Sequence, residues 1–290
     1  MSTAISWHDM RILGAIQVRS GITQAALADH VEVQGEKIRV IRNKSQLYVI
    51  TQARGFETFS QNFVSQANTP PPGVENTFSL TISDPRGRWL PRIMTVILPR
   101  DATANPASAR QQPNSLFQPI HADLLPASTA DIAPWWAIIR AHVQHQVNGS
   151  MQAVRGALLR VRAAPDTSPH DGIADGAPAN DAPVLGYGLS DVRGEALIAI
   201  PALPAHTFAN SIIGNRAVDD GDDDDQTANA PVVTFDTPCV LDAVADSNAS
   251  WPLDYQTLTT RFNDNTLLRS SLSLSLHAGI RHHLTLTLTP

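Results

Sequence analysis

The chain contains very little cysteine, lysine or charge of either sign. Cys239 is the single cysteine among 290 residues, which excludes an internal disulfide and any metal site built from several thiolates. Small secreted β-domains are often held by disulfides, so we expect synthesis in a reducing cytoplasm and a buried Cys239. Lys37 and Lys44 are the only lysines, and charged residues make up 17% of the chain. A surface so poor in charge suits β-sheets held inside an assembly.

The sequence also lacks the patterns that mark nucleic-acid binding, membrane insertion or secretion. The formal net charge is −6, and no Lys/Arg cluster is interleaved with aromatic residues, so nucleic acid is not an expected partner. No apolar run approaches the roughly 18 residues that cross a bilayer. Residues 1–9 show no basic region followed by an apolar core, so no signal peptide is predicted.

One turn motif is present twice. Residues 83–88 read SDPRGR, and residues 190–195 read SDVRGE. An aspartate at the start of a turn accepts backbone hydrogen bonds, and a glycine supplies the positive φ that such turns need. The copies lie roughly 100 residues apart, which is the length of a small β-sandwich domain. We therefore predict two related β-domains in tandem, whose turns are hairpins in equivalent positions. The turn residues are Asp84, Gly87, Asp191 and Gly194.

The pattern of apolar residues predicts an all-β chain of two Ig-like or transthyretin-like sandwiches. Residues 1–98 form the first domain, in which residues 37–42 and 77–82 alternate at period two. Residues 99–132 contain five prolines and form a Pro/Ala-rich linker or docking arm. Within it, Leu116 and Phe117 are the candidate interface residues. Residues 133–290 form the second domain.

Two segments of the second domain allow alternative interpretations. Residues 135–147 have both helical and strand spacing, and we favour a strand because it would open this domain as residues 10–18 open the first. Residues 217–229 form an acidic loop that could supply oxygen ligands to calcium. The loop lacks the alternating ligand spacing of a calcium site, which favours a solvated loop without a metal.

Two short segments near the C-terminus alternate strictly. Residues 272–276 read LSLSL and residues 284–288 read LTLTL, joined by a segment that contains Gly279. The pattern predicts a hairpin with one leucine face, packed on the core, and one hydroxyl face. Its last strand carries no charge that would block pairing with another chain. We therefore predict that Leu284, Thr285 and Thr287 contribute to a contact with another subunit.

The sequence contains no catalytic signature. There is no GxSxG elbow or phosphate-binding loop, and residues 186–191 begin like a dinucleotide fingerprint but end in aspartate. The His142/His145 and His282/His283 pairs each point to opposite faces of a strand, so neither forms a metal site alone. We predict no catalytic residue, cofactor or metal. The five tryptophans could form a sugar-binding platform, but packing in a core or an interface is favoured.

With these turns placed, the second half resembles carboxypeptidase regulatory-like domains. The resemblance rests on Gly188–Leu197 and on the Pro-x-Leu-Pro segment that follows and ends at Pro204. It also rests on the two alternating segments near the C-terminus, which have Ala278-Gly279 between them. The resemblance implies a transthyretin- or Ig-like sandwich without catalytic residues. In the first half, Val18-Arg19, residues 47–49 and residues 83–91 are similar to accessory β-domain proteins of phage-tail-like contractile injection systems.

The sequence thus predicts a non-catalytic structural or adaptor component of a multi-subunit assembly. The resemblance points to a contractile, phage-tail-like particle, with the chain as a baseplate or tail-end accessory, made in the cytoplasm and assembled into the particle. Its expected partners are other protein subunits or further copies of itself. A carbohydrate- or surface-binding module that uses exposed tryptophans is one alternative. An enzyme with a site assembled from scattered residues is another.

Overall fold

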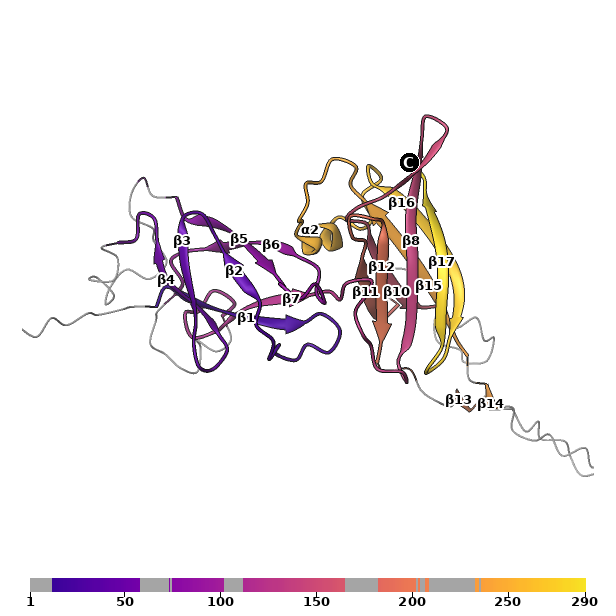
Figure 1. Cartoon of the computed structure of the whole chain (residues 1–290), viewed down its shortest axis with the longest axis horizontal. Coiled ribbons are helices and arrows are strands. Elements are labelled where there is room, and N and C mark those ends of the chain that lie inside the picture. Colours follow the sequence, from indigo (N-terminus) through magenta and orange to yellow (C-terminus); the bar gives the residue numbers. More distant parts are fainter. Residues whose placement is uncertain are drawn as a thin grey trace, which may run out of the picture.

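The computed structural model describes residues 12–57, 73, 75–101, 112–164, 182–201, 203, 207–208, 233–234 and 236–290. The chain forms two β-lobes side by side (Figure 1). The expected all-β class is confirmed, because strands dominate and the one α-helix in the described ranges is the six-residue α2 (Tyr255–Thr260). The predicted acidic loop 217–229 lies outside the described residues.

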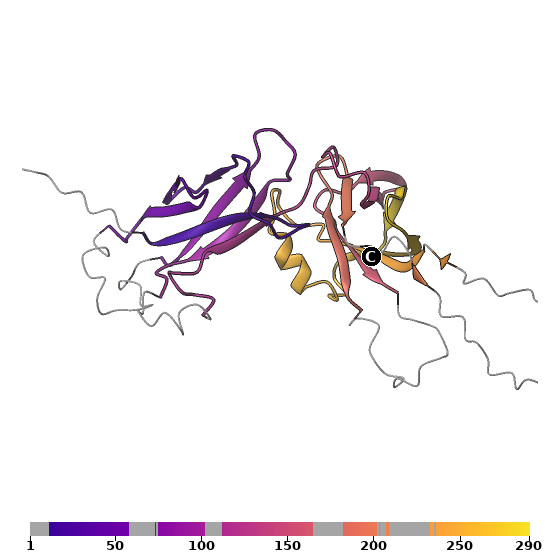
Figure 2. The ribbon, with the colours of Figure 1, turned by 90° about the horizontal axis from the view of Figure 1, so that it is seen from below.

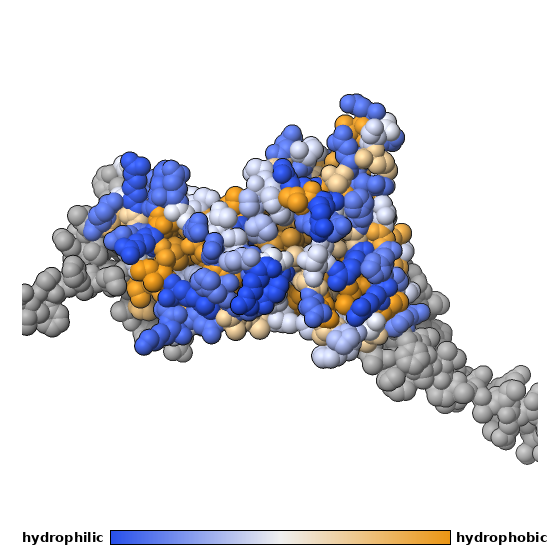
Figure 3. All heavy atoms as spheres, in the orientation of Figure 1, coloured by the Kyte–Doolittle hydropathy of each residue, from blue (hydrophilic) through white to orange (hydrophobic). Residues whose placement is uncertain are grey.

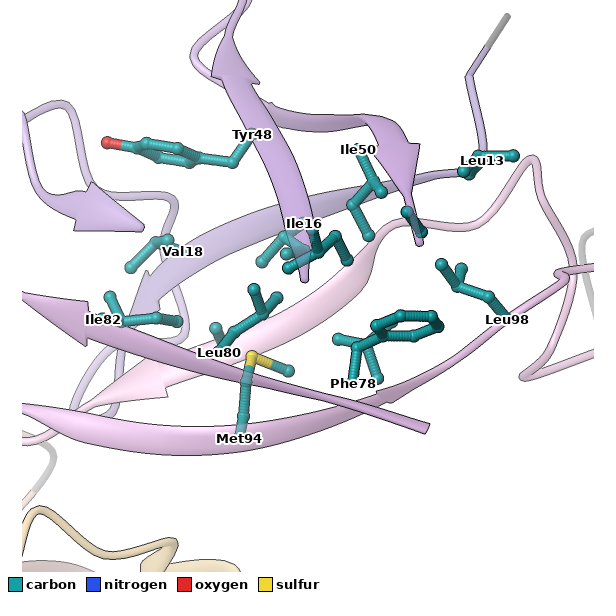
Figure 4. Close-up of a cluster of buried hydrophobic side chains, with 14 of the residues drawn as sticks. Leu13, Ile16, Val18, Tyr48, Ile50, Phe78, Leu80, Ile82, Met94 and Leu98 are labelled. Carbon is teal, nitrogen blue, oxygen red and sulfur yellow. The ribbon is translucent and has the colours of Figure 1, made fainter. Parts of the chain in front are cut away.

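The first lobe is a sandwich of two sheets. One sheet has the order β3-β4-β1-β7 and the other the order β2-β5-β6. Alternating residues of both sheets point inward, and Ile16, Ile50, Leu80 and Ile82 are completely or almost completely excluded from solvent (Figure 4). The strands are β1 (Gly14–Ser20), β2 (Glu32–Gln34), β3 (Ile38–Arg42), β4 (Tyr48–Ala53), β5 (Thr77–Ser83), β6 (Arg92–Ile97) and β7 (Ile120–Leu124).

The segment predicted as a linker, residues 99–132, contains the last strand of the first lobe. Its strand β7 pairs in parallel with β1, and Ala122 and Leu124 are buried in the first core. The first domain therefore extends to residue 124 rather than 98. The strand was missed because its apolar residues form too short a run among prolines to stand out, and its pairing partner lies about 100 residues away in the sequence.

The second lobe is also a sandwich of two sheets. One has the order β11-β10-β15-β16, and the other has the order β12-β8-β17 with β9 paired to β8. Residues 135–147 supply the strand β8, so the strand interpretation of this segment is confirmed. The strands are β8 (Ala137–Val147), β9 (Ser150–Ala153), β10 (Leu158–Ala163), β11 (Val184–Leu189), β12 (Glu195–Ile200), β15 (Thr237–Ala245), β16 (Leu268–Leu276) and β17 (Arg281–Leu288). The short strands β13 (Thr207–Phe208) and β14 (Val233–Thr234) pair with each other in a separate two-stranded sheet.

The two sandwiches share a strand plan. In each, the first long strand (β1 or β8) lies between the last strand, which is parallel to it, and an antiparallel strand (β4 or β12). The lobes differ in the strand before that antiparallel one. In the first lobe β3 pairs with β4, whereas in the second β11 joins the opposite sheet. The expectation of two related sandwiches thus agrees with the strand order.

The repeated turn motif does not mark equivalent positions in the two sandwiches. The turn at Asp84 joins β5 to β6, which are neighbours in one sheet, and is a hairpin as predicted. The turn at Asp191 joins β11 to β12, which lie in different sheets. The prediction of equivalent hairpins is therefore wrong, because a turn motif specifies local backbone geometry but not which strands the turn joins.

The predicted C-terminal hairpin is also wrong. Strand β16 pairs with β15 and strand β17 with β8, so the two alternating strands lie in opposite sheets and face each other across the core. Leu276, Leu286 and Leu288 are buried between the sheets, as the leucine pattern predicts. Leu272 is 39% exposed, and it lies in the middle of β16, which is the edge strand of its sheet.

The Gly-Tyr-Gly run of β11 explains how this strand packs closely against β12, which lies in the opposite sheet. A Cβ atom on Gly188 would lie 2.6 Å from the Ile198 side chain and 2.7 Å from the Leu197 carbonyl. A Cβ atom on Gly186 would also be tight against Ile198. Glycine in a strand commonly marks such a close approach. The run that starts like a dinucleotide fingerprint is thus a packing device.

Candidate functional site

Both copies of the turn motif have the predicted local structure. The Asp84 carboxylate accepts hydrogen bonds from the backbone N–H groups of Arg86 and Arg88, each at 3.0 Å. The N–H of Gly87 donates to the Asp84 carbonyl at 2.9 Å, with φ at +65°. These bonds satisfy the polar groups of the turn, so the motif residues have a structural role there.

The second turn repeats this arrangement. Asp191 Oδ1 accepts hydrogen bonds from the backbone N–H groups of Arg193, at 2.8 Å, and Glu195, at 3.0 Å. Gly194 has φ at +76°. Burial raises the pKa of the Asp191 carboxyl, but the backbone hydrogen bonds from Glu195 and Arg193 and the side-chain hydrogen bonds from Arg193 and Ser128 together hold the pKa below its usual value. The carboxylate is therefore kept ionised.

The two turns lie on either side of one short segment, Leu125–Ser128, which we call the junction segment. On the first-lobe side, the N–H of Leu90 donates to the Leu125 carbonyl at 2.9 Å, and the N–H of Ala127 donates to the Arg88 carbonyl at 2.8 Å. On the second-lobe side, Ser128 Oγ lies 3.2 Å from Asp191 Oδ2 and accepts a hydrogen bond from Arg193 at 3.2 Å. Each copy of the motif thus fixes one end of the junction segment.

An apolar cluster of its own lies between the lobes. Leu90, Leu125 and Ala127 of the first-lobe side are buried against residues of the second lobe. Helix α2 lies on the side of the second lobe that faces the first in both views (Figures 1 and 2). The second-lobe members of the cluster are Leu158, Leu189, Val244, Leu253, Tyr255, Leu258, Phe262 and Leu267.

A buried arginine connects the lobes through polar contacts. Arg92, at the start of β6, is 2% exposed. Its Nη1 donates to the Asp123 carbonyl at 3.0 Å, and its Nη2 donates to Asp254 Oδ1 at 2.9 Å across the domain boundary. Its guanidinium lies 4.9 Å from the centre of the Tyr255 ring. Asp254 also caps the N-terminus of α2 by accepting from the Gln256 N–H.

Two further groups surround this arginine. Arg19 binds the Asp123 carboxylate through Nε at 2.7 Å and Nη2 at 3.1 Å. The Tyr255 hydroxyl donates to the Asp123 carbonyl at 3.4 Å, and burial raises the pKa of Tyr255 to about 12. The junction is therefore an apolar cluster with a paired charge network beside it, and such contacts resist a change in the angle between the lobes.

The predicted interface residues lie in two separate places. Leu116 is half-buried and Phe117 is 61% exposed, in a first-lobe loop that Arg100 holds by donating to the carbonyls of Pro113, Ser115 and Gln118. Leu284 is half-buried and Thr285 and Thr287 are exposed on β17. The structure does not bring the two groups together.

The outer face of the β12-β8-β17 sheet carries a depression of about 440 Å³. Polar residues line much of it, but Glu195 is paired with Arg193 at 2.7 Å, and Arg140 donates weakly to the Ala130 carbonyl at 3.4 Å. Within the described ranges, no three His, Cys, Asp or Glu side chains are placed to hold a metal. The lining residues are Ser128, Arg140, Ala141, His142, Glu195, Ala196, His283, Leu284 and Thr285.

The tryptophans do not form a sugar-binding platform in the part of the chain that the structure describes. Trp135 is 67% exposed, but Trp136 is half-buried, and Trp89 and Trp251 pack against the first core and the junction cluster. On the face shown in Figure 3, hydrophobic areas are separated by hydrophilic residues. No helix of the described ranges is long and apolar enough to cross a bilayer.

Sequence reasoning missed the junction. Arg92 is one arginine at the start of a strand, and Ser128 is one serine in a proline-rich segment. Their importance depends on contacts with residues far away in the sequence. Helix α2 did have a signal, since Asp254 precedes it in a position where aspartate is a preferred N-cap.

No family model matches the chain, and no curated protein matches it significantly. Among solved structures, the shaft pilin SpaA of Lactobacillus rhamnosus GG is similar over 53% of this chain, with 10% identity and a TM-score of 0.26. The minor pilin GBS52 of Streptococcus agalactiae is similar over 96% of this chain and 97% of its own, with 6% identity and a TM-score of 0.22. This chain spans 49% of the length of the SpaA structure. These TM-scores are too low to transfer a function.

Proposed function

We propose that this protein is a non-catalytic structural component of a multi-subunit assembly, in which it holds two β-sandwiches at a fixed angle. The observation that carries the proposal is the junction. A flexible linker would leave polar backbone and few apolar contacts between domains. Here the junction segment is bonded to both lobes, and a buried arginine joins them.

Several polar or nucleophilic groups of the described residues have structural partners, which supports a structural role. The aspartates of the two motif turns accept hydrogen bonds from backbone N–H groups of their turns, and Glu195, which lines the outer depression, is paired with Arg193. The one cysteine, Cys239, is buried, its thiol donates to the Thr237 carbonyl at 3.3 Å, and burial raises its pKa. A thiol with a raised pKa is a poor nucleophile.

The finer proposal is that the assembly is a contractile, phage-tail-like particle with this chain as a baseplate or tail-end accessory. Its support is the resemblance of Val18-Arg19, residues 47–49 and residues 83–91 to accessory proteins of such systems. The likeness of the second half to carboxypeptidase regulatory-like domains supports the non-catalytic part of the proposal. The partners would be other protein subunits.

Native purification tests the proposal. The full chain, tagged and expressed at its natural level in its source cells, is purified under mild conditions and analysed by mass spectrometry and negative-stain electron microscopy. We expect defined partner subunits at fixed ratios and, for the finer proposal, tail-like particles. Recovery of the chain free of any stoichiometric protein partner would contradict the assembly role. A stable complex without tail-like particles would contradict only the finer proposal.

A further inference from the structure

The second sandwich has an open side at which two strand edges lack strand partners among the described residues. Among the strands that the structure describes, β17 has β8 as its one neighbour within a sheet, and β16 has β15. The two edges meet at one end, where Arg269 and Thr289 exchange two backbone hydrogen bonds, at 2.8 and 2.9 Å. A further contact runs from His282 Nε2 to the Ser275 carbonyl at 3.1 Å. Residues 277–280 connect the two strands at the other end, and between these ends no further backbone hydrogen bond joins β16 to β17.

The register of β17 shows which backbone groups face outward. The N–H of Ile138 donates to the Ile280 carbonyl, so in this parallel pair the even-numbered residues of β17 bond to β8. The N–H and C=O groups of the odd-numbered residues therefore point away from β8. These residues are Arg281, His283, Thr285 and Thr287. All four side chains are exposed.

This edge lacks the devices that normally prevent pairing with another chain. Edge strands are usually blocked by charged side chains, prolines or bulges. The first-lobe edge strand β3 shows such protection, with Arg39 and Arg42 along it. In contrast, no Asp, Glu, Lys or Arg lies between Arg281 and the end of β17. The neighbouring apolar side chains are also incompletely covered, since Leu272 is 39% exposed and Leu284 is half-buried.

We propose that two copies of this chain pair through this edge, β17 against β17 in antiparallel orientation, to form a twofold-symmetric dimer with a continuous sheet. The inference rests on the proposed assembly role and names one partner, a second copy. Placing Leu284 on the twofold axis sets Arg281 opposite Thr287 of the other copy and His283 opposite Thr285. Each of the four outward-facing residues then exchanges two hydrogen bonds with its opposite residue.

The edge is complementary to itself in charge as well as in hydrogen bonding. In this register each Arg281 faces a threonine, so no like charges are opposed, and the two Leu284 side chains meet on the inner face. Like charges directly opposite would destabilise the pair. A partner of high charge would gain nothing from the neutral stretch after Arg281, whereas a second copy places an uncharged threonine opposite Arg281 and opposite His283.

Sedimentation equilibrium of the full chain tests the dimer. We expect the wild-type chain to associate to twice the mass of one chain in the micromolar range. Thr285→Pro removes an N–H that does not face β8, and proline is tolerated at such edge positions. It should raise the dimer dissociation constant about 30-fold, because each dimer loses two hydrogen bonds worth about fivefold each. The matched control His142→Lys, on the same sheet face but on the central strand β8, should dimerise normally.

Cysteine cross-linking tests the register independently and remains informative if the proline variant does not fold. Leu284→Cys places a thiol on the twofold axis, where opposite Cα atoms are about 4.5 Å apart, a distance compatible with a disulfide. Thr285→Cys does not face its own copy in this register and should not cross-link. The wild-type chain, whose Cys239 is buried, is the blank.

Several results would overturn the inference. They are a wild-type chain that stays monomeric, a dimer that His142→Lys disrupts while Thr285→Pro does not, or cross-linking through position 285 instead of 284. A monomeric chain that still purifies with stoichiometric subunits would overturn the dimer and leave the proposed function standing. A chain that dimerises as proposed but purifies without other subunits would leave the dimer standing and contradict the proposed function.

Discussion

Substitution of Asp254 by asparagine should destabilise the protein through the buried arginine that it neutralises. The side chain of Arg92 is 3% exposed and that of Asp254 is 28% exposed, and their atoms are 2.9 Å apart. Asparagine is as good an N-cap as aspartate, so the change keeps the cap of α2 and removes only the charge. Arg92 is then left buried without its carboxylate partner.

The magnitude follows from the burial of the two groups. Removing one partner of a fully buried ion pair costs about 3–5 kcal/mol. Water reaches Asp254, and asparagine still offers an oxygen to Arg92, so we expect a loss of about 2 kcal/mol in the free energy of unfolding. Arg92→Met should cost less, about 1 kcal/mol, because it removes the buried charge and leaves Asp254 with access to water.

Urea denaturation of the full chain, followed by intrinsic fluorescence and circular dichroism, measures these values, and the double variant completes the cycle. In the Arg92→Met background, Asp254→Asn should lower the free energy of unfolding by less than about 0.5 kcal/mol. The guanidinium that the substitution would otherwise leave without its carboxylate partner is no longer present in that background. The reasoning is refuted if Asp254→Asn costs the same in both backgrounds, or if Arg92→Met is the more damaging single change.

Three further predictions concern the second lobe. Ser190→Ala should cost about 2–3 kcal/mol in urea denaturation, because the fully buried hydroxyl donates to one backbone carbonyl at 2.7 Å and accepts from one N–H at 2.8 Å. Gly188→Ala should cost more than Gly87→Ala, about 3 against 1 kcal/mol, since a Cβ at Gly188 meets backbone at 2.7 Å and one at Gly87 meets open space; equal costs would contradict this. Burial raises the pKa of Asp242, but the hydrogen bonds from Arg162, Ser271 and Arg160 and the charge of Arg162 together outweigh it and hold the pKa below its usual value of 3.8. Its stabilising effect is therefore full above pH 3.8 and is lost as pH falls below that value; Asp242→Asn should reduce the acid dependence of stability measured by denaturation at pH 2–5.

The sequence predicts features that depend on neighbours along the chain. Alternation in residues 77–82 predicts β5 and the buried faces of Phe78, Leu80 and Ile82. The same rule predicts that Leu276, Leu286 and Leu288 point to a core. The motif aspartates and glycines form the turns that their chemistry requires, because those hydrogen bonds span only two to four residues.

Features that depend on distant residues are not predictable in this way. Alternation fixes the face on which a leucine lies but not the strand beside it, so β16 and β17 look like a hairpin although they belong to opposite sheets. Strand β7 becomes visible only beside β1. The junction depends on Arg92 meeting Asp254, a contact across 162 residues of sequence that neither local pattern indicates.

The distance between the lobes tests the central claim most directly, since the proposed role requires the junction to fix their relative position. Spin labels attached to Thr51→Cys on β4 and Met151→Cys on β9 report this distance by pulsed electron paramagnetic resonance, and the buried Cys239 should stay unlabelled. We predict one narrow distance distribution in the full chain, and a broader one when Asp254→Asn is added. A broad distribution in the otherwise unaltered chain would contradict the account, because the two sandwiches would then move independently.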